Sequence, residues 1–133
     1  MVPTVSPRSM ISFFVPGIPR STQTGTVVRV KGRLFPLRRN TAWSQVIGLV
    51  ARQYAPPSPI ETPVAVSLYF FLPRPKSTRR VSPAVRPDLD NLAKGLTDSL
   101  NGVLWKDDAQ IISLFLAKSY HPRPGLEVRV ERR

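Results

Sequence analysis

The sequence contains no cysteine and a single histidine, His121. The absence of cysteine excludes disulfide bonds, thiolate metal sites and cysteine nucleophiles, and it agrees with a reducing compartment, so we expect a cytoplasmic protein. His121 lies in a proline-rich turn and has no metal-ligand partner beside it. We therefore predict a structural role for this histidine.

Long apolar runs are also absent. The longest ones are far shorter than the roughly 20 residues that a membrane-spanning helix needs, so we expect no membrane partner. The N-terminus has no apolar core between a basic start and a small-residue cleavage site, which argues against secretion. Residues 1–9 are predicted to form a flexible tail. Met10 opens the first patterned segment and is a candidate for the true start.

Acidic residues are scarce as well. Eight Asp and Glu stand against 20 Lys and Arg in 133 residues, which gives a net charge of +12 and a pI near 11.4. This balance indicates a polyanionic partner, and ribosomal and membrane-surface proteins share it. The length and the 41% content of hydrophobic residues predict one folded domain, over residues 10–133.

The few acids are gathered in one place. Five of the eight lie within residues 86–110 (RPDLDNLAKGLTDSLNGVLWKDDAQ), and they are Asp88, Asp90, Asp98, Asp107 and Asp108. Solubility does not require this clustering, whereas hard divalent cations are bound through oxygen ligands. The segment therefore predicts a site for Mg²⁺, with Mn²⁺ as a substitute. The structural alternative is a capped helix start followed by ordinary surface charge pairs.

The local pattern around these acids predicts one continuous helix over residues 91–101. Asp90 is its expected N-cap, and Gly102 is expected to end it. The apolar stripe recurs every four residues, at Leu92, Leu96 and Leu100. If residues 88–90 are extended, the carboxylates of Asp88 and Asp90 share one face of the chain.

The run Pro87-Asp88-Leu89-Asp90-Asn91-Leu92, followed by Lys94, Asp98 and the GVLWKDDAQ sequence of residues 102–110, resembles the signature of RusA-type Holliday-junction resolvases. The resemblance covers most of the chain from Met10 onward. It implies a small, homodimeric, magnesium-dependent endonuclease, of a kind often carried by phages and prophages. Such an enzyme resolves four-way DNA junctions by paired symmetric nicks.

The resemblance also implies roles for individual residues. Asp88, Asp90 and Asp108 would ligate one or two Mg²⁺ ions, which would activate a water. Lys94 would stabilise charge in the transition state or on the leaving group. Composition does not rank Asp107 against Asp108. In an extended chain only one of the two could face the other acids. The resemblance selects Asp108, and Asp107 is expected to point outward or to cap the turn after Lys106.

Two basic regions without acids are predicted to contact DNA phosphates. The first is residues 20–39, which include a predicted two-residue hairpin turn at Lys31-Gly32. The second is the loop 73–86, directly before the acidic segment. Solvated loops without a partner are the alternative for both. The predicted DNA-binding residues are Arg33, Arg38, Arg39, Arg74, Lys76, Arg79, Arg80 and Arg86.

The remaining pattern predicts an α+β domain, in which two helices pack on a mixed, mostly antiparallel sheet of about four strands. The predicted strands are 10–15, 62–72, 111–120 and 126–131, and the first helix is expected over 40–54. Strand 62–72 is apolar on both faces, which predicts a central position. Strand 111–120 is likewise expected to be buried, and to form a hairpin with strand 126–131.

Two other functions fit parts of the sequence. A non-catalytic, basic nucleic-acid-binding protein would share the charge but leaves the clustered aspartates unexplained. A metal-dependent nuclease acting on flaps or on RNA would share the acids, because substrate shape is recognised by loops and by the dimer.

Overall fold

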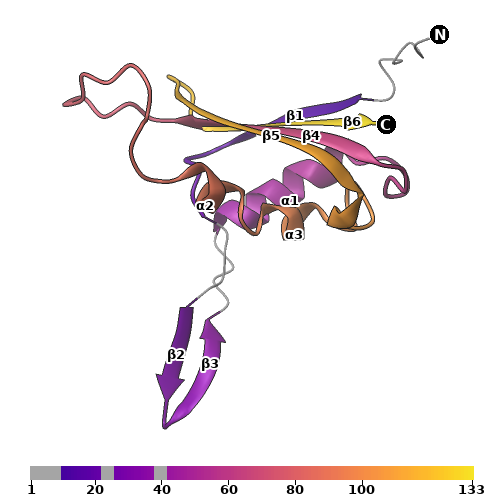
Figure 1. Cartoon of the computed structure of the whole chain (residues 1–133), viewed down its shortest axis with the longest axis horizontal. Helices are drawn as coiled ribbons and strands as arrows, with labels where there is room; N and C mark the ends of the chain where they lie inside the picture. The colour runs from indigo at the N-terminus through magenta and orange to yellow at the C-terminus, as the bar shows by residue number, and fades with distance from the viewer. Residues whose placement is uncertain (1–9, 22–25, 38–41) are drawn as a thin grey trace.

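The computed structural model describes residues 10–21, 26–37 and 42–133. The predicted tail over residues 1–9 lies outside the described residues. So do two predicted DNA-binding residues, Arg38 and Arg39, and the predicted helix start at Asn40. In the described part, a four-stranded sheet carries all the helices on one of its faces (Figure 1), which is the α+β architecture expected from the sequence.

The sheet has the strand order β1-β6-β4-β5, with β1 at Met10–Pro16, β6 at Gly125–Arg132, β4 at Val64–Leu72 and β5 at Ile111–Tyr120. The β1–β6 and β6–β4 pairs are antiparallel, and the β4–β5 pair is parallel. The sheet is therefore mixed and mostly antiparallel. The predicted central position of β4 is confirmed, since it lies between β5 and β6.

The predicted hairpin of β5 with β6 is wrong, because β4 lies between these two strands. Two strand spacings amount to about 10 Å. The link over residues 121–124 is long enough to span them, since each extended residue covers at most about 3.5 Å. Both strands therefore pair with the strongly apolar β4 rather than with each other.

The predicted burial of β5 is also wrong. This strand lies at the edge of the sheet, and three of its apolar side chains are 64%, 48% and 53% exposed, namely Ile112, Leu114 and Phe115. An apolar strand usually has covered faces and two neighbouring strands. Here β4 is the one strand in the described part of the chain that pairs with β5.

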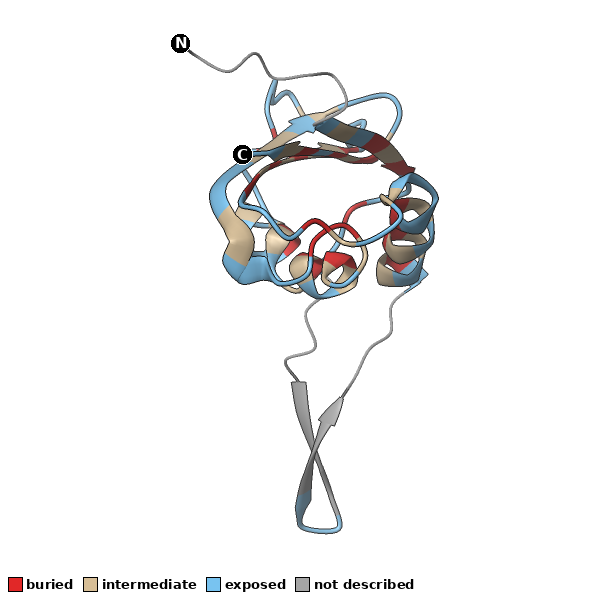
Figure 2. Cartoon of the chain, turned by 90° about the vertical axis from the view of Figure 1, so that its right-hand side faces the viewer, coloured by how far each residue is buried: buried red, intermediate tan, exposed pale blue. Residues whose placement is uncertain are grey.

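The core lies between the sheet and the helix layer (Figure 2). Helix α1 (Ala42–Tyr54) lies along β1 and α3 (Leu96–Leu100), and it buries Trp43, Ile47 and Ala51 in this core. Gly17 permits a close approach, because a Cβ atom there would lie 2.9 Å from the Trp43 ring and the backbone has φ of +133°.

The predicted helix over residues 91–101 is two short helices, α2 (Leu89–Ala93) and α3 (Leu96–Leu100). Gly95 separates them with φ of +79°, a left-handed conformation that glycine adopts without steric cost. The predicted stripe is nevertheless correct, since Leu92, Leu96 and Leu100 are all buried. The continuous helix is therefore wrong, whereas its buried face is confirmed.

A second sheet of two strands, β2 (Thr26–Val30) and β3 (Arg33–Leu37), extends away from the helix layer (Figure 1). Its turn is the predicted one: Val30 pairs with Arg33, and Lys31 and Gly32 have φ of 50° and 78°. Arg33, a predicted DNA-binding residue, is exposed beside this turn.

Candidate functional site

The acidic segment begins at the start of α2. Asp88 is the N-cap, with extended backbone, and its carbonyl oxygen accepts the Leu92 N–H at 3.0 Å. Its carboxylate makes no capping hydrogen bond, and Asp90 lies in the first helical turn. Both aspartates are exposed. The expected extended geometry over residues 88–90 and the Asp90 N-cap are therefore wrong, because the helix begins at Leu89, two residues earlier than predicted.

Asp88 lines a surface hollow of about 660 Å³ together with Arg86, Asn91 and Ser21. The hollow combines a carboxylate with a guanidinium, a group that binds phosphate oxygens. The predicted basic and acidic elements therefore meet at this point of the surface.

Lys94 and Asp98 follow in the next two turns. Lys94 is the C-cap of α2, where its backbone N–H donates to the Asp90 carbonyl oxygen at 2.9 Å. Asp98 lies beyond the Gly95 break, in α3. Both side chains are exposed. In one continuous helix, Asp90, Lys94 and Asp98 would lie one turn apart on the same face. The break at Gly95 interrupts this arrangement.

The second group of acids lies in a short 3₁₀ turn, η2 (Asp108–Gln110). The Asp107 carboxylate accepts the Ala109 N–H at 3.0 Å, and Gln110 Oε1 accepts the Asp107 N–H at 2.8 Å. The predicted capping role of Asp107 is thereby confirmed. The extended chain expected here is wrong, since residues 108–110 are helical.

The two neighbouring carboxyls have opposite pKa shifts. A hydrogen bond to Asp107 raises the pKa of Asp108, and some loss of hydration and the negative charges of Asp107 and Asp98 act in the same direction. The Ala109 N–H, and then the hydrogen bond from Asp108, lower the pKa of Asp107. Asp98 therefore interacts electrostatically with Asp108, at the C-terminal end of the acidic segment.

One chain does not bring Asp108 together with Asp88 and Asp90. Strand β5 begins directly after η2, and near its other end Lys118 bonds to the carbonyl oxygen of Pro87, next to Asp88. From Ile111 to Lys118 an extended strand spans roughly 23 Å. In the described part of the chain, no group of three or more Asp, Glu, His or Cys side chains is placed to hold a metal ion.

Two residues of the segment have structural roles that the sequence analysis missed. Gln110 Nε2 donates to the carbonyl oxygens of Ile60 and Thr62 at 2.7 and 2.9 Å, which holds η2 against the chain that leads into β4. The buried Trp105 donates from Nε1 to Asn101 Oδ1 at 2.7 Å. The D-x-x-Q spacing of a capping box was the available signal for Gln110.

The basic loop over residues 73–86 projects beyond the sheet just before α2 (Figure 1). Its five predicted DNA-binding residues are all exposed, and they are Arg74, Lys76, Arg79, Arg80 and Arg86. The ion pairs found among the described residues involve none of these five. The positive charge of this loop is therefore available to an external anion.

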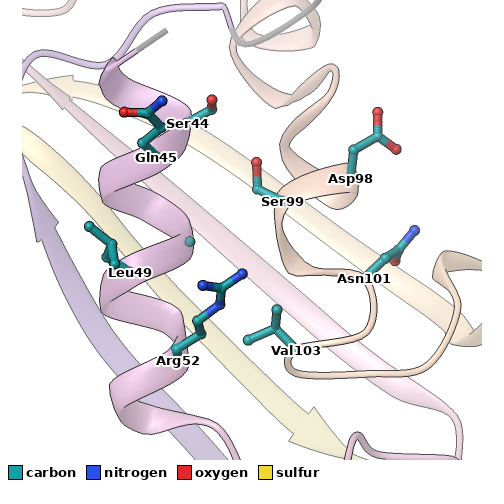
Figure 3. A pocket seen from close by; sticks show the side chains of 9 residues that line it. Ser44, Gln45, Leu49, Arg52, Asp98, Ser99, Asn101 and Val103 are labelled. Carbon is teal, nitrogen blue, oxygen red and sulfur yellow. The ribbon is translucent and has the colours of Figure 1, made fainter. Parts of the chain in front are cut away.

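A separate groove of about 500 Å³ lies between α1 and α3 (Figure 3). Polar side chains of the two helices line it, including Ser44, Gln45 and Arg52 on one side and Asp98, Ser99 and Asn101 on the other. None of the three predicted metal ligands lines this groove, so it is distinct from the predicted site.

No helix in the part of the chain that the structure describes combines the length and the apolar character needed to cross a membrane.

Comparison with known proteins identifies a family. The family described as endodeoxyribonuclease RusA matches residues 16–131, a range that includes the acidic segment and both basic regions. A Bacillus subtilis (strain 168) protein, described as "Uncharacterized protein YqaN", is 30% identical over 134 residues. That alignment covers 90% of this chain and 94% of the relative.

Proposed function

Because the chain belongs to the RusA family of endodeoxyribonucleases, we propose that residues 10–133 form a metal-dependent nuclease that resolves four-way DNA junctions by paired nicks. The observation that carries the proposal is the position of the exposed Asp88 and Asp90 directly after the basic loop 73–86. A loop of this charge binds the phosphates that flank a scissile bond, and carboxylates bind the metal that hydrolysis requires. We propose that the enzyme acts on DNA in the cytoplasm.

We further propose that the working form is a homodimer joined through β5. This strand lies at the edge of the sheet and has exposed apolar side chains, and it contains no proline or acid that would discourage pairing. Two such edges related by a two-fold axis pair antiparallel. Paired in this way, the Asp108 end of one β5 lies beside the Asp88 end of the other.

This pairing would bring together carboxylates that one chain keeps apart. Carboxylate oxygens fit Mg²⁺ or Mn²⁺, but one chain does not gather enough of them to hold the ion. In the proposed dimer, Asp88 and Asp90 of one subunit and Asp108 of the other would hold Mg²⁺, with Lys94 beside the bound phosphate. The two-fold axis also provides two sites, as symmetric nicking of a junction requires.

Cleavage of three labelled DNA substrates tests the proposal. The substrates are a synthetic four-way junction, a flap and a linear duplex, each with Mg²⁺ and with EDTA. We expect symmetric nicks in the junction that EDTA abolishes, and we expect Asp90→Asn to bind the junction without cutting it. If the protein cuts the flap in preference to the junction, the flap is its substrate and the proposed junction specificity is wrong. If the wild type binds DNA without cutting it, the protein is a non-catalytic DNA-binding protein.

A further inference from the structure

Lys118 is the one charged residue of β5, in the sequence IISLFLAKSY. It is paired in register with Phe70 of β4, so it lies on the core-facing side of the sheet, where Phe70 is fully buried. Lys118 is itself partly buried. A lysine in such a place is unfavourable unless its ammonium group has hydrogen-bond partners.

The partners of Lys118 are backbone carbonyl groups. Its Nζ donates to the carbonyl oxygen of Val85 at 2.7 Å and to that of Pro87 at 2.9 Å. Hydrogen bonds from a charged donor are stronger than neutral ones. Two of the three donors of the ammonium group therefore hold the two residues on either side of Arg86, directly before Asp88.

The segment that Lys118 holds is the end of a long loop. Residues 73–88 connect β4 to α2 without helix or strand. The backbone hydrogen bonds of Thr78 and Ala84 are local, to Pro75 and Ser82. The bonds from Lys118 instead join residues 33 and 31 positions apart in the sequence. They connect the start of α2 to the sheet.

We propose that Lys118 is a positioning residue, which fixes Asp88 relative to β5 through the carbonyl groups of Val85 and Pro87. The inference rests on the proposed function, because Asp88 is a proposed metal ligand there. Since η2 joins directly to the other end of β5, this strand would set the separation of the two acidic groups. Lys118 acts through the backbone and touches neither metal nor substrate.

Three variants separate this role from general loss of positive charge. Lys118→Met keeps the apolar stem and removes the donors, whereas Lys118→Arg keeps charge and donors. Lys106→Met is the matched control, because Lys106 is 73% exposed and its one described ion pair is to Glu61, at 3.6 Å. Each variant is assayed by single-turnover junction cleavage over a range of Mg²⁺ concentrations, and by junction binding without metal.

We expect Lys118→Met to bind the junction as Lys106→Met does. Its half-maximal Mg²⁺ concentration should rise by about tenfold or more, as for loss of a group that orients a ligand. High Mg²⁺ should restore much of its rate, and Lys118→Arg should restore most of the Mg²⁺ affinity. An unchanged Mg²⁺ requirement in Lys118→Met would overturn the inference.

Amide hydrogen exchange provides a readout that does not depend on activity. The N–H groups of Leu92 and Lys94 bond to the carbonyl groups of Asp88 and Asp90. We expect these amides to exchange about tenfold faster in Lys118→Met, with α1 unchanged, because local opening controls their protection. If the wild type does not cut junctions, the proposed function fails while exchange still tests the positioning. Unchanged exchange at both amides would overturn it.

Discussion

Asp107 and Gln110 are joined across one 3₁₀ turn: the Asp107 N–H donates to Gln110 Oε1 at 2.8 Å, and the Gln110 N–H donates to the Asp107 carbonyl oxygen at 3.0 Å. The Asp107 carboxylate is engaged as well, by the Ala109 N–H. Asp107 therefore holds the turn together, and the adjacent Asp108 is the proposed metal ligand of this pair.

The two aspartates should respond differently to substitution. We expect Asp108→Asn to lower the rate of junction cleavage at least about a hundredfold, which is the effect expected when a metal ligand, or a residue that supports one, is lost. Asp107→Asn should retain most activity, because the amide oxygen can still accept the Ala109 N–H. Single-turnover cleavage of a labelled junction measures both. The reverse ranking would show that Asp107 is the ligand.

The same pair should titrate in a fixed order. In metal-free protein, Asp108 should lose its proton at higher pH than Asp107, because the Asp107 carboxylate stabilises the protonated form of Asp108. Asp107→Asn removes that negative charge, so the pKa of Asp108 should fall toward its ordinary value. Carboxyl ¹³C NMR titration of both proteins measures the two midpoints. An equal Asp108 midpoint in both would contradict the coupling.

Gln110 should contribute to stability. Gln110→Ala removes the side-chain bonds to the carbonyl groups of Ile60 and Thr62 and to the Asp107 N–H. We expect the free energy of unfolding to fall by about 1–3 kcal/mol, measured by urea denaturation. Gln45→Ala on the exposed surface of α1 is the control, with an expected change within about 0.5 kcal/mol. If both variants lowered the free energy of unfolding equally, the hydrogen bonds of Gln110 would have no special importance for stability.

The β5 edge should decide the oligomeric state. Leu114→Lys places like charges close to the two-fold axis of the proposed dimer, so we expect a monomer by light scattering and loss of paired nicking. Leu49→Lys is the control, since Leu49 is 60% exposed on α1, outside the proposed interface. A wild type that stays monomeric, both free and on junction DNA, would contradict the dimer.

The basic loop should control the salt dependence of junction binding. Replacing Arg79 and Arg80 together by Gln should flatten the plot of log affinity against log salt by roughly one to two units, because fewer counterions are released. The control is the double replacement of Arg132 and Arg133, at the other end of the sheet (Figure 1). An unchanged slope for Arg79 and Arg80 would exclude the loop from the DNA interface.

Patterns confined to a few neighbouring residues predicted the structure well. The Lys31-Gly32 turn forms because a two-residue hairpin loop favours positive φ, and both residues have it. The apolar face of α1 is buried as its spacing required. The second helix was predicted wrongly because its leucine spacing indicated a continuous helix, whereas Gly95 adopts a left-handed conformation that interrupts it.

The sequence by itself determined which chemical groups lie close together along the chain: a carboxylate-rich segment beside a basic loop, and an Asp107-x-x-Gln110 cap, all of which depend on residue type and short spacing. Only the tertiary structure decided the place of β5. Its pairing with β4 joins residues far apart in the chain, such as Val64 and Ile111, and local periodicity carries no information about such contacts. That pairing puts Asp88 and Asp108 at opposite ends of β5, and no other strand in the described part of the chain covers its outer side, where the second copy would pair in the proposed dimer.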